Sequence, residues 1–416
     1  MSFLARLASG VTRGRSNSQN PKQVEESKTS YRRETETERR SREHREVVQN
    51  KVNVATIYNK KDYKPVSRTS VKDLTKKNDR TLQQFRAIID DAPVCSLEKL
   101  KQLSWSGVPQ ETRSVAWKLL FEYIPLNRDK REAALAKKRA EYDKMREYYL
   151  RETENDNFSE KERQAFRVIE ADVHRTQPDY PLFHVKCIQA MLVRILTIWH
   201  LRHPASGYVQ GMNDLTAPLL AAFLLDYINI DYDTFNVPSD LEKILSVEKL
   251  HELEADMYFC LCKILEGIQD NYTNSQPGTY RSVARIRDLL KRIDKDLLEH
   301  LETNEINLMQ IVIRWVFCLL IREFPLKLAM RLFDTYISDD EGFTQLHSYI
   351  SVVLLTKWSP KIKKMQFHEI MLFLQNLPTK EWSEQDINMV IAEAYVYKSM
   401  FEFDTKHKPV IISRRQ

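Results

Sequence analysis

The chain has 416 residues, a net charge of +6 and only 8 glycines, and it contains neither GxGxxG nor GxxxxGK[ST], which argues against a dinucleotide-binding fold or a P-loop of its own. Its 5 cysteines are odd in number and widely spaced, which argues against a disulfide framework and a zinc site. The longest apolar runs reach about 11 residues, whereas a membrane-spanning helix needs about 20, so we expect a soluble protein with free thiols.

Residues 1–81 are predicted to be a disordered basic tail, because polar and charged residues dominate there and apolar residues are too sparse to offset the entropy of ordering. Residues 1–80 hold 20 Lys and Arg against 10 Asp and Glu, a net charge of +10. The other residues hold 44 against 48, a net charge of −4. The excess positive charge therefore lies in the tail, and the nearly balanced body is not expected to bind nucleic acid.

The tail has two features that could mediate contacts. Its first apolar residues could form a short amphipathic helix on an acidic membrane surface, or serve in a targeting peptide, although Gly10 and Gly14 weaken that helix. Two basic Ser/Thr stretches, 15–18 and 68–70, could be phosphorylated. Membrane contacts or phosphorylation-dependent adaptor contacts could thus run through the tail. The apolar residues in question are Phe3, Leu4, Leu7 and Val11.

From Leu82 onward apolar residues recur at helical spacing, which predicts one large all-helical domain over residues 82–405, followed by a C-terminal tail, 406–416. Pro109 can begin a helix, because its missing N–H would be unsatisfied at that position anyway. Residues 127–165 are rich in Lys, Arg, Glu and Ala, and we interpret them as exposed helix.

Arg175 is expected where a helix gives way to a loop, because the chain soon reaches Pro178 and proline disfavours helix in the residue before it. Asp172 lies three residues earlier on the same helical face, so its carboxylate could pair with the guanidinium and fix its direction. Taken alone, an arginine here could equally be an ordinary helix-end cation.

Two of the scarce glycines, Gly207 and Gly211, bracket Gln210 just after a predicted buried helix that ends before Pro204. Glycine lets the backbone turn tightly or approach a partner closely. We therefore expect this stretch to hold the Gln210 side chain in place. By itself the glutamine could equally be a helix cap or a satisfied buried amide.

The rest of the chain continues the helical pattern. Ser239 and Glu242 match a capping box that starts helical sequence running to about Ile268. The stretch 306–323 is apolar on most faces, which predicts the centre of the core. Further helices are expected over residues 280–301, 326–336, 346–358, 365–374 and 387–401.

Two short stretches stand out as motifs: IEADVHR, ending at Arg175, and YVQG, beginning at Tyr208. They match I-x-x-D-x-x-R and Y-x-Q-G, and they resemble the signature motifs of TBC-domain Rab GTPase-activating proteins. The likeness covers roughly residues 100 to 400, although Phe333 stands where the family commonly has Trp. The other matching stretches are Gly107-Val108-Pro109 with Arg113 and Trp117, Arg314-Trp315, Arg322-Glu323-Phe324-Pro325 and Arg331-Leu332-Phe333-Asp334.

Finer features resemble the Golgi-associated subgroup of this family. They are His203-Pro204-Ala205-Ser206 before YVQG, and Asp270-Asn271-Tyr272 with Gln276-Pro277-Gly278. This resemblance implies a cytoplasmic protein, peripherally associated with Golgi or other endomembranes, that regulates vesicle traffic.

The family resemblance implies a single multi-helix TBC-type domain that accelerates GTP hydrolysis by a Rab. Arg175 would be an arginine finger that stabilises charge on the phosphate, and Gln210 would position the attacking water. The partner would be a GTP-bound Rab that carries both the nucleotide and Mg²⁺, so the chain itself would need no cofactor. The residues that would orient these groups or contact the GTPase are Asp172, Tyr208, Gly211, Asn213, Asp214 and Arg113.

Two alternatives stay open. One is a catalytically inactive Rab-binding adaptor, against which the intact Arg175 and Gln210 count. The other is a helical scaffold in membrane traffic whose basic tail binds acidic membrane or nucleic acid. An enzyme with a small-molecule site of its own is disfavoured, because the scattered histidines form no recognisable nucleophile–base pattern.

Overall fold

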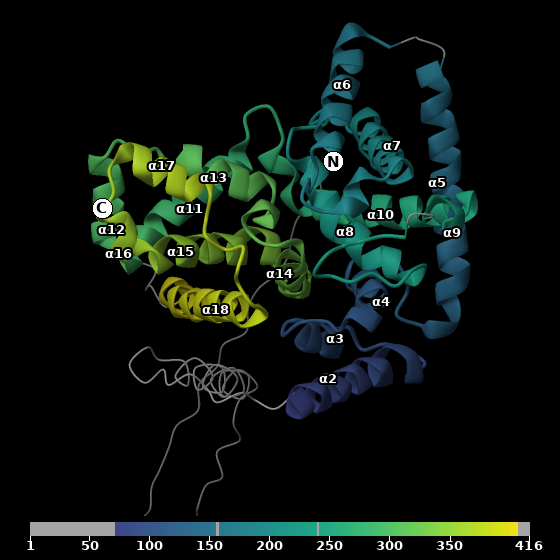
Figure 1. The fold of residues 1–416 in the computed structure, drawn as a ribbon, viewed down its shortest axis with the longest axis horizontal. Coiled ribbons are helices and arrows are strands. Elements are labelled where there is room, and N and C mark those ends of the chain that lie inside the picture. Colours follow the sequence, from purple (N-terminus) through teal and green to yellow (C-terminus); the bar gives the residue numbers. More distant parts are fainter. Residues whose placement is uncertain (1–70, 155–157, 239–240, 407–416) are drawn as a thin grey trace, which may run out of the picture. The chain divides into compact units, whose positions relative to one another are not determined.

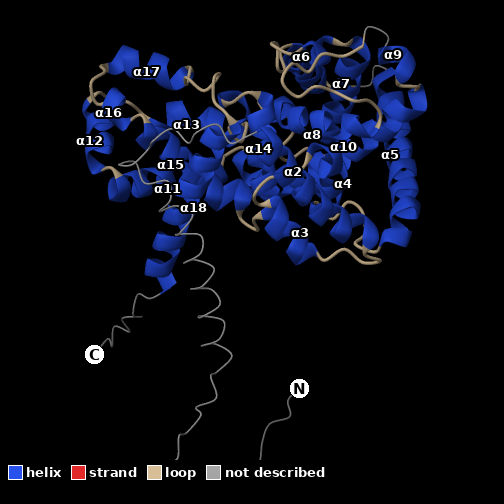
Figure 2. Cartoon of the chain, turned by 60° about the horizontal axis from the view of Figure 1, so that its bottom comes forward, coloured by secondary structure: helices blue, strands red, loops and turns tan. Residues whose placement is uncertain are grey.

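A computed structural model describes residues 71–154, 158–238 and 241–406. In this part of the chain every regular element is a helix, and the isolated backbone bridge there joins Val94 to Asn127. Figure 2 shows these helices connected by loops. The predicted all-α fold class is confirmed.

The elements follow one another with short connections (Figure 1). The first half contains α2 (Val71–Arg86), α3 (Leu97–Ser104), α4 (Gln110–Leu120), α5 (Arg131–Glu154), α6 (Glu160–His174), α7 (Lys186–Arg202), α8 (Thr216–Phe223), α9 (Leu241–Ile244) and α10 (Val247–Ile268). The second half contains α11 (Pro277–Ile293), α12 (Lys295–Thr303), α13 (Leu308–Phe317), α14 (Leu326–Ser338), α15 (His347–Lys357), α16 (Ser359–Ile362), α17 (Phe367–Gln375) and α18 (Glu384–Lys406).

Short helical turns lie between several of these helices. Two are π-helical, η1 (Ala87–Asp91) and η8 (Gly342–Leu346). The others are 3₁₀ turns, namely η2 (Arg128–Lys130), η3 (Pro181–His184), η4 (Met212–Leu215), η5 (Leu224–Asp226), η6 (Gln269–Asn271) and η7 (Ile321–Glu323).

The ends of the predicted domain stay predictions. Helix α2 begins at Val71, before the predicted domain start at residue 82, and α18 extends to Lys406. Residues 1–70 and 407–416 lie outside the described residues, and with them the predicted amphipathic segment, the phosphorylation stretches and most of both tails.

Two of the predicted helical stretches are each divided into two helices, because a polar side chain caps a new helix inside each of them. The predicted helix over 280–301 ends at Ile293, and the Asp294 carboxylate then accepts the Leu297 N–H at 3.0 Å to start α12. The helical sequence up to Ile268 is likewise interrupted before α10, where Ser246 is the N-cap. The predicted capping box includes Ser239, which lies outside the described residues.

The predicted stretch 306–323 is part of the buried core, but α8 and α14 are more completely buried. Every residue of α8 is buried, as is almost all of α14, whereas α13, inside the predicted stretch 306–323, leaves Gln310 exposed. In Figure 1, α14 lies between the neighbourhood of α4 and α8 and that of α11, α13 and α15. It contacts α3, α4 and α8 on one side and α18 on another. The apolar stretch 306–323 thus predicted core residues correctly, but it did not predict which helix is the most deeply buried.

Two further expectations concern the state of the cysteines and the possibility of a membrane-spanning helix. All five cysteines are free thiols, and Cys95, Cys260 and Cys318 are buried. None of the helices in the described ranges combines the length and the apolar character that a bilayer crossing requires.

Candidate functional site

Helix α6 carries Arg175 to the surface at its C-terminal end. The helix starts at a capping box, in which Ser159 and Glu162 bond each other's backbone N–H, and it ends at His174. Arg175 follows as the C-cap, and its N–H donates to the carbonyl of Asp172 at 3.2 Å. At the other end of the helix, α5 ends at Glu154 and α6 begins at Glu160, so the predicted exposed stretch 127–165 is shared between these two helices.

Asp172 directs the Arg175 guanidinium toward solvent. Nη2 of Arg175 forms an ion pair with Oδ1 of Asp172, as the three-residue spacing predicts. The Asp172 side chain is 1% exposed, whereas that of Arg175 is 58% exposed. A buried carboxylate therefore holds a guanidinium that remains accessible to another molecule.

The second carboxylate oxygen of Asp172 holds the loop that follows α7. The Tyr208 hydroxyl lies 2.7 Å from Asp172 Oδ2 and 3.2 Å from Asn213 Oδ1. Burial, together with the negative charge of Asp172, raises the pKa of Tyr208, so the phenol stays protonated and donates to the carboxylate. One carboxylate thus fixes both the end of α6 and the loop 207–211.

Asn213 makes a further connection between the two segments. Its Nδ2 donates to Thr176 Oγ1 at 2.8 Å and to the Asp172 carbonyl at 3.3 Å. Its Oδ1 accepts the Gly211 N–H at 3.2 Å. All of these groups belong to the loop after α6 or to the loop after α7, so the Asn213 side chain fixes the position of one loop relative to the other.

Gln210 lies in the exposed turn between Tyr208 and η4. The turn depends on Gly211, which has φ +106° and lies so close to the C-terminal end of α13 that a Cβ would be 3.2 Å from Cys318 Sγ. The sequence prediction that glycine holds this stretch in a tight turn is confirmed at Gly211. The carboxamide of Gln210 and the guanidinium of Arg175 are therefore both exposed on loops that share Asp172 as an anchor.

We expect Gly211→Ala to destabilise the protein by about 1–3 kcal/mol, because alanine is strained at this positive φ and its methyl group would press on Cys318. Gly267→Ala is the matched control: Gly267 is helical, and a Cβ there would meet nothing within 4 Å. That control should be neutral or stabilise the protein by about 0.5–1 kcal/mol. Chemical denaturation of both variants tests the expectation, which fails if the two behave alike.

Asp214 lies beneath this surface rather than on it. The side chain is buried in η4, and the Cys318 thiol donates to its Oδ2 at 3.3 Å. Burial raises the pKa of Asp214, and the positive charge of Arg322 opposes that effect. Asp214 can support the loop but does not reach an external ligand.

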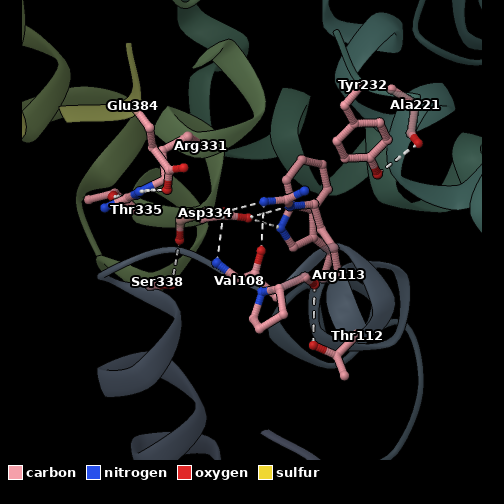
Figure 3. Close-up of polar contacts among 12 residues, drawn as sticks. Val108, Thr112, Arg113, Ala221, Tyr232, Arg331, Asp334, Thr335, Ser338 and Glu384 are labelled. Carbon is pink, nitrogen blue, oxygen red and sulfur yellow. Dashed lines mark hydrogen bonds and ion pairs between the residues drawn. The ribbon is translucent and has the colours of Figure 1, made fainter. Parts of the chain in front are cut away.

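Arg113 is placed away from this site, which corrects the prediction that it orients the site or contacts a GTPase. Its Nε and Nη2 donate to the two oxygens of Asp334 at 3.1 and 3.0 Å, and Nη2 also donates to the Val108 carbonyl at 2.6 Å (Figure 3). Burial by itself would lower the pKa of the guanidinium, but the charge of Asp334 outweighs it, so the pKa is raised. The buried Arg113–Asp334 pair joins α4 to α14, so Arg113 has a structural role.

Sequence reasoning missed three residues that build the site, Thr176, Cys318 and His200. Thr176 accepts from Asn213, Cys318 packs under Gly211, and Nδ1 of His200 accepts the Tyr208 N–H at 2.9 Å. The only available signal was that Thr176 adjoins Arg175. Cys318 is distant from the glutamine in sequence, and His200, eight residues before Tyr208 on α7, is marked by no motif.

The arrangement suits an external anionic ligand. A guanidinium can donate to two oxygens at once, and a carboxamide can both accept from and donate to a water molecule. In the described ranges, no group of three or more His, Cys, Asp or Glu side chains could hold a metal ion.

Comparison with known proteins gives concordant matches. Residues 110–363 match the Rab-GTPase-TBC domain family. The GTPase-activating protein gyp1 of Schizosaccharomyces pombe is 39% identical over 322 residues, which are 77% of this chain and 61% of that protein. Human TBC1 domain family member 22B is 39% identical over 336 residues, 80% of this chain and 64% of that protein. The chain therefore spans somewhat less than two thirds of the length of these relatives.

Two solved structures are similar to this fold. The Ypt/Rab-GAP domain of Gyp1p superposes with a TM-score of 0.71 at 37% identity, covering 78% of this chain and 99% of that domain. The flagellar RabGAP TBC domain of Chlamydomonas has a TM-score of 0.54 at 19% identity, covering 77% of this chain and 92% of that one, and this likeness concerns the fold alone.

Proposed function

This chain belongs to the Rab-GTPase-TBC domain family, and from that premise we propose that it is a GTPase-activating protein for Rab GTPases. One observation carries the proposal: Asp172 binds Arg175 with one carboxylate oxygen and Tyr208 with the other. This arrangement presents the guanidinium of Arg175 and the carboxamide of Gln210, two residues after Tyr208, together on the surface.

Arg175 acts as the arginine finger. During hydrolysis negative charge is spread over the oxygens of the transferred phosphoryl group, and an arginine supplied by another protein stabilises it. Such a finger accelerates hydrolysis by about 10³–10⁵. The ion pair with Asp172 limits the directions in which the guanidinium can point, so less entropy is lost when it enters the GTPase.

Gln210 orients the attacking water. Its carbonyl oxygen accepts a hydrogen bond from the water and its amide group donates to the phosphate or to the GTPase backbone. Tyr208, Gly211 and Asn213 hold the backbone of this turn, and Asp214 supports it from within.

The partner is a GTP-bound Rab, which brings both the nucleotide and Mg²⁺, so this chain needs no cofactor of its own. The protein acts on the cytoplasmic side of Golgi or other endomembranes, a placement supported by the motif around His203 and by 270–278. Its N-terminal tail makes the membrane or adaptor contacts. Single-turnover hydrolysis by a panel of GTP-loaded Rabs identifies the substrate and tests the proposed activity.

We expect Gln210→Ala to lower the stimulated hydrolysis rate of the responsive Rab by about 100-fold, comparable to the loss of one preorganised hydrogen-bonding group in an active site. Gln102→Ala removes another exposed glutamine, from α3, and should leave the rate unchanged. If Gln210→Ala lowers the hydrolysis rate by less than about threefold, which is under 1 kcal/mol, then the Rab's own glutamine rather than Gln210 positions the attacking water.

A further inference from the structure

The imidazole of His200 contacts the backbone of the loop that carries Gln210. It lies in the last turns of α7, and its Nδ1 is 2.9 Å from the backbone nitrogen of Tyr208. A backbone N–H can only donate, so Nδ1 must be the acceptor. The ring is therefore neutral, with its proton on Nε2.

The surroundings hold the ring in that place. Gly207 has φ +62°, and a Cβ at this residue would lie 3.2 Å from Nδ1 and 3.3 Å from Cε1 of His200. Glycine thus leaves the space that the imidazole occupies. On the other side, the ring of Phe166 from α6 meets the imidazole edge-on, with centroids 6.0 Å apart.

Tyr208 is consequently held at both ends. His200 binds its backbone N–H and Asp172 binds its hydroxyl. Asp172 also binds Arg175, so Tyr208 is linked to the arginine through Asp172, while the imidazole fixes the Tyr208 backbone two residues before Gln210.

We propose that His200 is a positioning residue for the Gln210 turn, and that protonation of His200 weakens activation of the GTPase. This inference rests on the proposed function. A proton on Nδ1 replaces the acceptor by a donor that faces the Tyr208 N–H, which releases the backbone two residues before Gln210.

The charged groups around the ring determine the pH range. Burial lowers the pKa of His200 from its ordinary value of 6.5, Glu162 of α6 opposes this and Lys161 of α6 adds to it. From the loop, the protonated Tyr208 phenol carries no charge. Because the folded pKa is depressed, the bond is intact above the ordinary histidine pKa and is lost as the pH falls through the lowered value.

The test is single-turnover hydrolysis by a responsive GTP-loaded Rab with the full chain, from about pH 7.5 to about pH 4.5, a range that extends well below the ordinary histidine pKa so that it includes a lowered value. At neutral pH, His200→Ala should lower kcat by about 3- to 10-fold, the effect of one lost hydrogen bond, with KM changed less than about twofold. His200→Asn places Oδ1 near the position of Nδ1 and does not titrate, so it should restore most of kcat.

The pH profile distinguishes positioning from packing. The ratio of wild-type to His200→Asn activity cancels the Rab's own pH response, and it should fall at acidic pH. The matched control is His251→Asn on α10, another half-buried histidine whose pKa burial lowers, but whose neighbours include Arg146 and Glu254 rather than this loop. Its profile should parallel the wild type.

Parallel profiles of wild type and His200→Asn would overturn the inference, as would full kcat in His200→Ala. In both cases activation that depends on Arg175 would persist, so the proposed function would stand. If the wild type activates no Rab at any pH, the proposed function and the role of His200 fall together.

Discussion

Arg175→Ala is expected to lower the stimulated rate of GTP hydrolysis by about 10³–10⁵, the full contribution of an arginine finger, or about 4–7 kcal/mol of the activation barrier. Arg175→Lys should be nearly as inactive, because a lysine ammonium cannot donate to two phosphate oxygens in a fixed planar geometry. The fold should persist, since Asp172 keeps its bond to Tyr208 in both variants.

Single-turnover hydrolysis with a responsive Rab measures this effect, and chemical denaturation confirms that each variant is folded. Arg167→Ala is the control, because Arg167 is exposed on the same helix and pairs with Glu160 at 3.4 Å. That variant should activate the Rab normally. Near-wild-type rates in Arg175→Ala or Arg175→Lys would remove the arginine finger from the proposed mechanism.

Asp334→Ala is expected to lower the free energy of unfolding by about 3–5 kcal/mol, the cost of leaving one member of a buried ion pair without its partner. The Arg113 side chain is 9% exposed and would lose both carboxylate bonds. The same substitution removes the acceptor of the Trp117 indole N–H at 2.8 Å and of the Val108 N–H at 2.9 Å. These groups lie at the contact of α4 with α14, so the loss affects the core.

Asp340→Ala provides the matched comparison. Asp340 also pairs with a basic residue, Lys101, but its side chain is 83% exposed whereas that of Asp334 is fully buried. An exposed pair contributes about 0–1 kcal/mol, so this variant should unfold almost like the wild type. Urea denaturation of the two variants decides the point, and equal losses would mean that burial does not control the strength of the Arg113–Asp334 pair.

The parts of the site that were predicted correctly depend on local spacing. Arg175 is three positions after Asp172, which places both on one helical face, and their ion pair is present. The glycine at 211 indicated a tight turn beside Gln210, and the backbone there has φ +106°. Neither inference required knowledge of what packs against the segment.

The errors arose where a remote residue decides the outcome. Arg113 lies in a motif and was assigned to the functional surface, but its guanidinium is buried against Asp334, 221 residues further along the chain. Likewise, an apolar pattern continues through Asp294, where the chain ends one helix and caps the next. Side-chain spacing along a helix does not report which face another helix covers.

The sequence by itself determined the helical class and the local placement of Arg175 and Gln210, because helical periodicity, proline and glycine act within a few residues. Only the tertiary structure decided that Tyr208 binds Asp172, 36 residues away, and that His200 accepts the Tyr208 N–H. The first bond depends on how α6 and α7 pack together, which reflects the shapes of many buried side chains at once, and the second depends on how the loop after α7 folds back onto that helix.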